Sequence, residues 1–147
     1  MKTSSHVRRI PHITICVSDV KTAVSFYQGI LGLEKIGEWP GYAQFDIAGV
    51  GLGLERRPKP EICLLVDDVD KAYAHLKDKG VKFVSEPKDQ SWGARAATFL
   101  DPDGNMLVIE SFECKVCGKI CDTYRELLEE HLRRHKRQGK EQENSGN

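Results

Sequence analysis

The sequence predicts an α+β fold in which two similar β-α-β-β-β units pair, followed by a small C-terminal module. The first observation is an internal repeat: "VSDVKTAV" from Val17 and "VDDVDKAY" from Val66 match at four positions with an offset of 49 residues. The second is that each segment follows a β-rich run and precedes three strand-like runs. Because such a unit cannot cover its own sheet, we expect the two to pair and curve into a cleft.

The first unit begins with the strand-like run "HITICV" at 12–17. Asp19 is suited to cap a helix that opens there, and Gly32 to end it. Apolar residues recur at spacings of three and four between these two positions, as expected for an amphipathic helix. Strands are expected next over 33–39, 42–48 and 50–55.

The second unit follows the same plan, starting with the run "EICLLV" at 61–66. Asp68 caps its helix and Gly80 ends it. The three strands expected after this helix cover 81–85, 94–100 and 105–110.

The repeat selects four polar candidates for the cleft. The offset of 49 carries His12 onto Glu61, and each terminal carboxylate, Glu55 or Glu110, lies six residues after a turn glycine. Glu110 and Glu55 are therefore the candidate catalytic carboxylates, as metal ligand or general base.

These segments resemble the vicinal oxygen chelate superfamily, which includes glyoxalase I, fosfomycin and bleomycin resistance proteins and extradiol dioxygenases. The resemblance covers residues 9–112 and rests on "HITICVSDVKTAVSFYQGILGL", "ICLLVDDVDKAYAHLKDKGV" and "WGARAATFLDPDGNMLVIE". It implies a divalent ion held by a His or Glu from the first strand of each unit and a Glu from the last strand, acting as a Lewis acid.

The ligand pattern is incomplete in this chain. His12 and Glu61 match the first-strand positions, but Val108 occupies the last-strand position, and Glu110 lies on the same strand face about 7 Å further along. A cleft metal held by His12, Glu61 and Glu110 is one interpretation. In the other, the cleft has no metal: His12 caps a strand, Glu61 pairs with a nearby arginine, and Glu110 is solvated.

Three further residues are candidates for contact with a small ligand: Trp92, Arg95 and Arg56. An aromatic face beside a guanidinium suits a planar or anionic molecule. A Trp packed at the surface and solvated arginines are the alternative.

The C-terminal stretch 113–137 resembles a Cys2His2 zinc finger, a small ββα module. Cys114-x2-Cys117, thirteen residues and His131-x3-His135 have the spacing of a closed structural zinc site. Cys121 is expected to fill the core of the module rather than bind the ion, since the other four residues complete the shell. Residues 1–8 form an N-terminal extension, and 138–147 are expected to be disordered.

The finger is not expected to read DNA. The helix positions that contact bases in such fingers correspond to Tyr124, Leu127 and Glu130, and none of these is suited to bidentate base recognition. The formal net charge is zero, which also gives no general reason to bind nucleic acid. A stabilising role, or contact with a protein partner, is expected instead.

The sequence contains no signal-like or membrane-spanning apolar run, so we expect a cytoplasmic protein with reduced thiols. The resemblance also implies a homodimer. Three functions stay open. The first is metal-assisted isomerase, lyase, transferase or dioxygenase-like chemistry on a small oxygen-rich molecule. The second is metal-free binding or sequestration of a small ligand, as in bleomycin resistance proteins, and the third is metabolite sensing with the finger contacting a partner.

Overall fold

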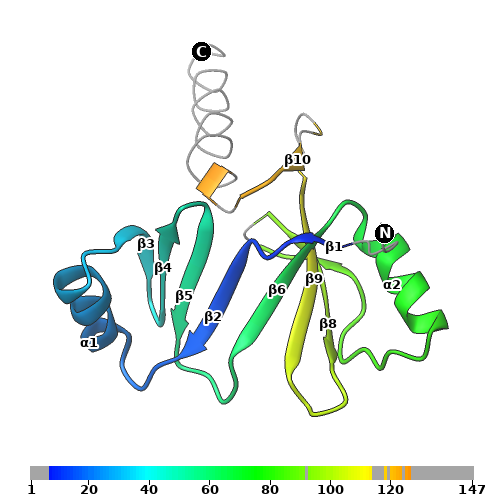
Figure 1. Ribbon diagram of the computed structural model, residues 1–147, viewed down its shortest axis with the longest axis horizontal. Helices are drawn as coiled ribbons and strands as arrows, with labels where there is room; N and C mark the ends of the chain where they lie inside the picture. The colour runs from blue at the N-terminus through cyan, green and yellow to red at the C-terminus, as the bar shows by residue number, and fades with distance from the viewer. Residues whose placement is uncertain (1–6, 92, 114–117, 119, 124, 127–147) are drawn as a thin grey trace, which may run out of the picture.

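The computed structural model describes residues 7–91, 93–113, 118, 120–123 and 125–126. Two β-α-β-β-β modules lie side by side in one mixed sheet, with a helix on the outside of each module (Figure 1). This arrangement confirms the α+β fold class and the paired modules expected from the repeat.

In the first module the helical segment is continuous but changes type. Helix α1 (Val20–Val24) starts where Asp19 Oδ1 accepts a hydrogen bond from the Thr22 amide at 2.9 Å. It runs directly into the π-helical turn η1 (Ser25–Ile30). The strands of this module are β2 (His12–Cys16), β3 (Glu34–Trp39), β4 (Tyr42–Ile47) and β5 (Val50–Glu55).

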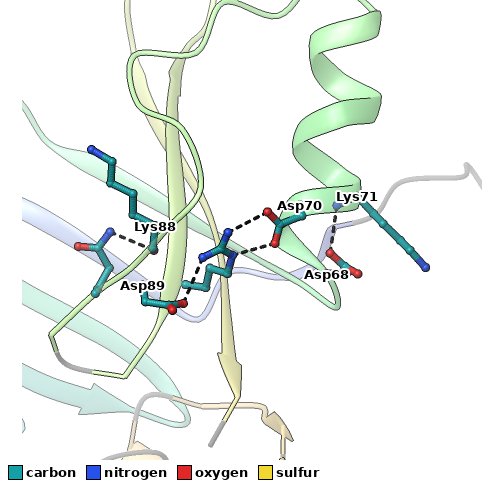
Figure 2. Close-up of polar contacts among 7 residues, drawn as sticks. Asp68, Asp70, Lys71, Lys88 and Asp89 are labelled. Carbon is teal, nitrogen blue, oxygen red and sulfur yellow. Dashed lines mark hydrogen bonds and ion pairs between the residues drawn. The ribbon is translucent and has the colours of Figure 1, made fainter. Parts of the chain in front are cut away.

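The second module has a longer regular helix, α2 (Val69–Asp78), which Asp68 caps by accepting from the Lys71 amide at 3.0 Å (Figure 2). Its strands are β6 (Glu61–Val66), β7 (Lys88–Asp89), β8 (Arg95–Leu100) and β9 (Met106–Glu113).

The prediction of a strand over 81–85 is wrong. Only Phe83 forms a bridge, to Phe99, and the amides of Val84 and Ser85 both donate to the Thr98 carbonyl. Because two successive amides share one acceptor, a regular ladder cannot continue through this segment. The edge strand forms later, as β7.

The two modules meet at their first strands. The sheet order is β3-β4-β5-β2-β6-β9-β8-β7, with β2 antiparallel to β6. Each first strand pairs in parallel with the last strand of its own module, β2 with β5 and β6 with β9. Two short strands join at one end of the sheet: β1 (Val7–Arg9) pairs with β6, and β10 (Ile120–Cys121) pairs with β9 (Figure 1).

Side-chain alternation gives the sheet two different faces. The outer face packs against the helices, in one apolar cluster around Phe45 and Leu54 in the first module and another around Val69 and Ile109 in the second. We call the opposite surface the inner face; it is the face on which the sequence predicts the cleft. No helix in the described part of the chain is both long and apolar enough to cross a membrane.

The segment after β9 returns to the end of the sheet where β9 finishes. Cys121 is fully buried in a cluster with Leu65, Ala94 and Phe112, and Ile36 of the other module packs against this cluster. Arg125 extends the contact, since it pairs with Glu34 and Asp46 of the first module.

Candidate functional site

A His, a Cys and a Glu from three strands meet on the inner face. His12 Nε2 of β2 lies 2.5 Å from Glu110 Oε1 of β9. One ring nitrogen of His12, one carboxylate oxygen of Glu110 and Cys63 Sγ of β6 all lie within 4.8 Å of one another. The exposed fractions of His12, Cys63 and Glu110 are 6%, 1% and 1%. We call these three residues the His12 cluster.

Strand pairing explains why these residues converge. Ile13 pairs with Ile62 and Thr14 with Glu61 in the antiparallel β2–β6 ladder. Continued by one residue, this register brings His12 to the level of Cys63. On the other side of β6, Leu65 pairs with Glu110, so the carboxylate projects from the neighbouring strand.

Burial governs the ionisation of the Cys63 thiol in this cluster. Burial, followed by the negative charges of Glu110 and Glu61, raises the pKa of the Cys63 thiol well above its ordinary value. The thiol is therefore protonated near neutral pH and donates to Glu61 Oε1 at 3.7 Å. A buried carboxylate needs a compensating partner, and the imidazole of His12 is in contact with it.

An aromatic side chain packs beside the imidazole. The rings of His12 and Phe112 stack with centroids 6.5 Å apart and an interplanar angle of 23°. Phe112 is fully buried, so it shields this end of the inner face from solvent. Phe112 is not among the cleft candidates selected from the sequence.

A second charged group lies further along the same face. Arg57 Nη2 is 2.9 Å from Glu61 Oε2, and Arg57 Nη1 is 3.5 Å from Glu55 Oε2. Arg57 Nη2 also lies 3.3 Å from the sulfur of Met106. The exposed fractions of the Arg57, Glu61 and Glu55 side chains are 18%, 20% and 42%. We call Glu55, Arg57 and Glu61 the Arg57 cluster.

The sequence-derived candidates are thus divided between two places. The structure brings His12 and Glu110 into contact, whereas Glu61 and Glu55 bind Arg57. Arg56, the neighbour chosen from the sequence as a ligand contact, is exposed.

Arg95 contacts carboxylates around α2. Its Nε and Nη2 donate to the two carboxylate oxygens of Asp70 at 2.7 and 2.9 Å, and its Nη1 donates to Asp89 at 3.3 Å. Figure 2 shows Asp70 at the start of α2 and Asp89 on the nearby edge segment. The hydrogen bonds to Asp70 raise the pKa of Arg95. A ligand would therefore compete with two acidic side chains for this guanidinium.

The remaining candidates lie outside the described residues. They are Trp92, chosen as a ligand contact, and the four expected zinc ligands, Cys114, Cys117, His131 and His135.

Cys63 is not among the candidates selected from the sequence, because a cysteine inside an apolar run is usually a packing residue. A usable signal was present. Cys63 lies two residues after Glu61 and Glu110 two residues after Val108, so both ligand-type residues are displaced by the same step from the positions of the family pattern. Val108 packs with Cys63 and Ala96 in a small apolar cluster.

The inner face of the first module is closed by a polar pair. The Tyr42 hydroxyl donates to Gln44 Oε1, and Gln44 is fully buried. An added Cβ on Gly53 would lie 2.6 Å from the Tyr42 hydroxyl and 2.9 Å from Thr14 Oγ1. The close packing of these two side chains therefore requires glycine at position 53.

Comparison with known proteins gives a consistent assignment. The sequence profile of the Glyoxalase/Bleomycin resistance protein/Dioxygenase superfamily matches residues 9–109. The uncharacterized protein YraH of Bacillus subtilis is 32% identical over 123 residues, which cover 69% of this chain and 96% of YraH. Metallothiol transferase FosB of Staphylococcus epidermidis is 26% identical, over 71% of this chain and 84% of FosB.

A solved structure shows the same arrangement of strands and helices. The Mn(II)-bound glyoxalase from Novosphingobium aromaticivorans superposes with a TM-score of 0.60 at 27% identity, covering 71% of this chain and 38% of that protein. Together with the repeat, the profile match over 9–109 decides the relationship. The chain belongs to the glyoxalase/bleomycin resistance protein/dioxygenase superfamily.

Proposed function

We propose that this protein binds a small, oxygen-rich molecule on its inner face through a divalent metal ion, with His12 and Glu110 among the ligands. The observation that carries the proposal is the contact between these two side chains, which come from different modules and lie 2.5 Å apart in a buried position. A bound divalent ion supplies Lewis-acid polarisation of substrate oxygens.

The donor set on the inner face fits such an ion. An imidazole, a carboxylate and a thiol, all buried, lie within 4.8 Å of one another. These are the donor types that zinc and related ions take in proteins. Glu61, the third residue of the ligand set expected from the sequence, is paired with Arg57 at 2.9 Å.

Carboxylates and a cation further along the inner face would assist the reaction. In this proposal Glu110 binds the ion, or accepts a proton in its absence, and Glu55 is the candidate general base. Arg57 lies between Glu55 and Glu61 and is placed to hold an anionic group of the substrate. Arg56, Arg95 and Trp92 stay candidate ligand contacts.

Metal-dependent binding is the first test. Metal-depleted protein, titrated calorimetrically with oxalate as a small chelating dianion, should bind it only after a divalent ion is restored. A His12→Ala variant should lose the metal-dependent part of the oxalate binding, while His75→Ala, a change on helix α2, should retain it. Equal binding by metal-depleted and metal-loaded wild type would contradict the metal-dependent function.

Group transfer is the reaction to test first. Since FosB relatives are metallothiol transferases at 25–26% identity, we propose addition of a thiol to a small electrophile as the candidate activity. Loss of free thiol in the presence of an epoxide-containing acid, with His12→Ala as the inactive control, measures it.

A metal-free binding protein is the second candidate. Val108 favours it, because this buried apolar residue occupies the position where the family pattern has a carboxylate ligand. In that case binding of the small ligand would survive complete removal of metal.

For the C-terminal stretch we propose a structural zinc held by Cys114, Cys117, His131 and His135, with contact to a protein partner rather than DNA. Two observations support it. Residues 112–113 of β9 pair with residues 120–121 of β10, as expected for a hairpin carrying two thiolates. Full burial of Cys121 beside Phe112 supports a packing role for that residue.

Zinc content checks the finger directly. A Cys114→Ser variant should bind one zinc fewer than wild type, and unchanged zinc content would contradict the finger.

We also propose a cytoplasmic homodimer, since superfamily members often dimerise; sedimentation at several protein concentrations measures the oligomeric state.

A further inference from the structure

The internal repeat relates the two charged clusters of the inner face to each other. An offset of 49 residues carries His12 to Glu61 and Thr14 to Cys63. The ladders agree, since His12 pairs with Gly51 as Glu61 pairs with Met106, and Thr14 pairs with Gly53 as Cys63 pairs with Val108.

The same relation holds for the last strands. An offset of 55 residues carries Glu55 to Glu110 and Arg57 to Phe112. Cys16 pairs with Glu55, and Leu65 pairs with Glu110, which places the two carboxylates at matching positions. The Arg57 cluster and the His12 cluster therefore occupy equivalent positions in the two halves of the repeat.

In the Arg57 cluster, the chain supplies its own cation. Arg57 reaches Glu61 at 2.9 Å and Glu55 at 3.5 Å, so one guanidinium lies between two carboxylates. The side chains there are 18–42% exposed, and solvent screens the remaining charge.

In the His12 cluster, the residue equivalent to Arg57 is Phe112, which stacks on His12 and carries no charge. Glu110 is 1% exposed, and the thiol of Cys63 replaces the hydroxyl of Thr14. A buried carboxylate thus faces a thiol and an imidazole where the equivalent position holds an arginine. Each of these three groups can donate an electron pair to a metal.

We propose that the His12 cluster is a thiolate-containing metal site, in which His12 Nε2, Cys63 Sγ and the Glu110 carboxylate bind Zn²⁺ or a similarly thiophilic ion. This inference rests on the proposed function and names its third ligand, which is Cys63 rather than Glu61. In the second module, β6 and β9 each supply a ligand two residues beyond the position in the family pattern: Cys63 follows Glu61, and Glu110 follows Val108.

The geometry requires only a small adjustment. With bonds of about 2.0–2.3 Å, two ligands on one tetrahedral zinc lie about 3.5 Å apart. The three donor atoms lie within 4.8 Å of one another, and the closest pair, from His12 and Glu110, is 2.5 Å apart. A bound ion would separate this pair by about 1 Å, which rotation of two side chains can provide.

The donor types decide which ion the site prefers. A metal binds the deprotonated thiol, so binding would release the thiol proton to solvent and leave a thiolate ligand. Because thiolate is a soft ligand, the site prefers Zn²⁺ or Co²⁺ to Mn²⁺ or Mg²⁺.

The experiment counts the ions bound by the full chain. Metal-depleted protein is reloaded with Zn²⁺ and its stoichiometry is measured by native mass spectrometry for wild type, Cys63→Ser, Glu110→Gln and the control Glu61→Gln. The first two variants should bind one ion fewer than wild type, with affinity for that ion reduced by roughly 100-fold or more. Glu61→Gln should match wild type. In the Co²⁺ form, Cys63→Ser should also lose part of the thiolate-to-cobalt charge-transfer absorption.

The contrary results are distinguishable. Loss of the ion in Glu61→Gln but not in Cys63→Ser would overturn this inference and leave the metal-dependent function standing. Wild-type stoichiometry in all three variants would overturn the site and the metal-dependent function together.

A measurement on wild type covers the case in which a variant does not fold. Bound Mn²⁺, followed by electron paramagnetic resonance, should be displaced by two equivalents of Zn²⁺, one for the finger and one for the His12 cluster. Mn²⁺ that holds its place against Zn²⁺ would overturn a thiolate ligand.

Discussion

The two modules share a strand register but stabilise their inner faces differently. The first module has glycines at positions 51 and 53, where the second has Met106 and Val108, and it fills the space with the half-buried Tyr42 and the buried Gln44. The second module packs the returning C-terminal segment against Phe112. Duplication therefore preserved the backbone positions, while substitutions at equivalent positions produced one arginine-bound end and one buried end suited to a metal.

The largest expected effect on stability comes from replacing Phe112, and it should exceed the effect of replacing the equivalent residue Arg57. Phe112→Ala should lower the free energy of unfolding by about 3–5 kcal/mol, because it removes a fully buried ring from the cluster with Leu65 and Cys121. Arg57→Ala should cost about 1–2 kcal/mol, since its ion pairs are partly exposed. Urea unfolding measures both. Equal costs would show that the two ends are closed in the same way.

The contrast between Gly53 and its equivalent Val108 gives the next effect. Gly53→Ala should destabilise by about 1–3 kcal/mol, because the new Cβ meets the Tyr42 hydroxyl at 2.6 Å and Thr14 Oγ1 at 2.9 Å. Gly29→Ala is the matched control, since nothing lies within 4 Å of its added Cβ. Thermal unfolding of the two variants checks the difference, and a neutral Gly53→Ala would mean that the first module repacks easily.

Arg125 tests how firmly the C-terminal segment is attached to the first module. Arg125→Ala removes the ion pairs with Glu34 and Asp46, one of which lowers the pKa of Glu34. Because these groups are partly exposed, the cost should be about 0.5–1 kcal/mol and should shrink at high salt. Urea unfolding at low and high salt measures it. A salt-independent loss would point to packing rather than charge.

The smallest effect concerns pH and the turns before β5 and β9. Hydrogen bonds from the side chain and amide of Asn105 lower the pKa of Asp101, whereas the equivalent Asp46 pairs with Arg125. Since the folded-state pKa lies below the unfolded value, this stabilisation is present above the unfolded pKa and is lost as pH falls through the folded one. The melting temperature of wild type should therefore fall more than that of Asp101→Asn on acidification. Parallel curves would contradict the assignment.

Much of the fold could be predicted from the sequence because the signals are local. Asp19 and Asp68 cap their helices as predicted, and strand alternation correctly separates the helix-covered residues from those of the inner face. The absence of a strand over 81–85 could not be predicted, because these residues have strand propensity. In the structure, two of their amides donate to one carbonyl of β8. Such a convergence depends on the neighbouring strand.

The site was predicted in part. The repeat identified His12 and Glu110, which are in contact, but it grouped them with Glu61 and Glu55, which bind Arg57. Cys63 could not be selected from the sequence, because a cysteine within an apolar run is usually a packing residue. Its relation to His12 appears only when β2 and β6 pair.

The sequence alone determined the duplicated β-α-β-β-β pattern, the helix starts and the set of residues that share a strand face, because each of these depends on spacing along the chain. The tertiary structure alone decided which polar residues meet. The antiparallel register of β2 and β6 places His12 at the level of Cys63, and the parallel register of β6 and β9 adds Glu110. It also decided which end is buried, since Cys121 and Phe112, which pair across β10 and β9, pack against Leu65 of β6 and Ile36 of β3.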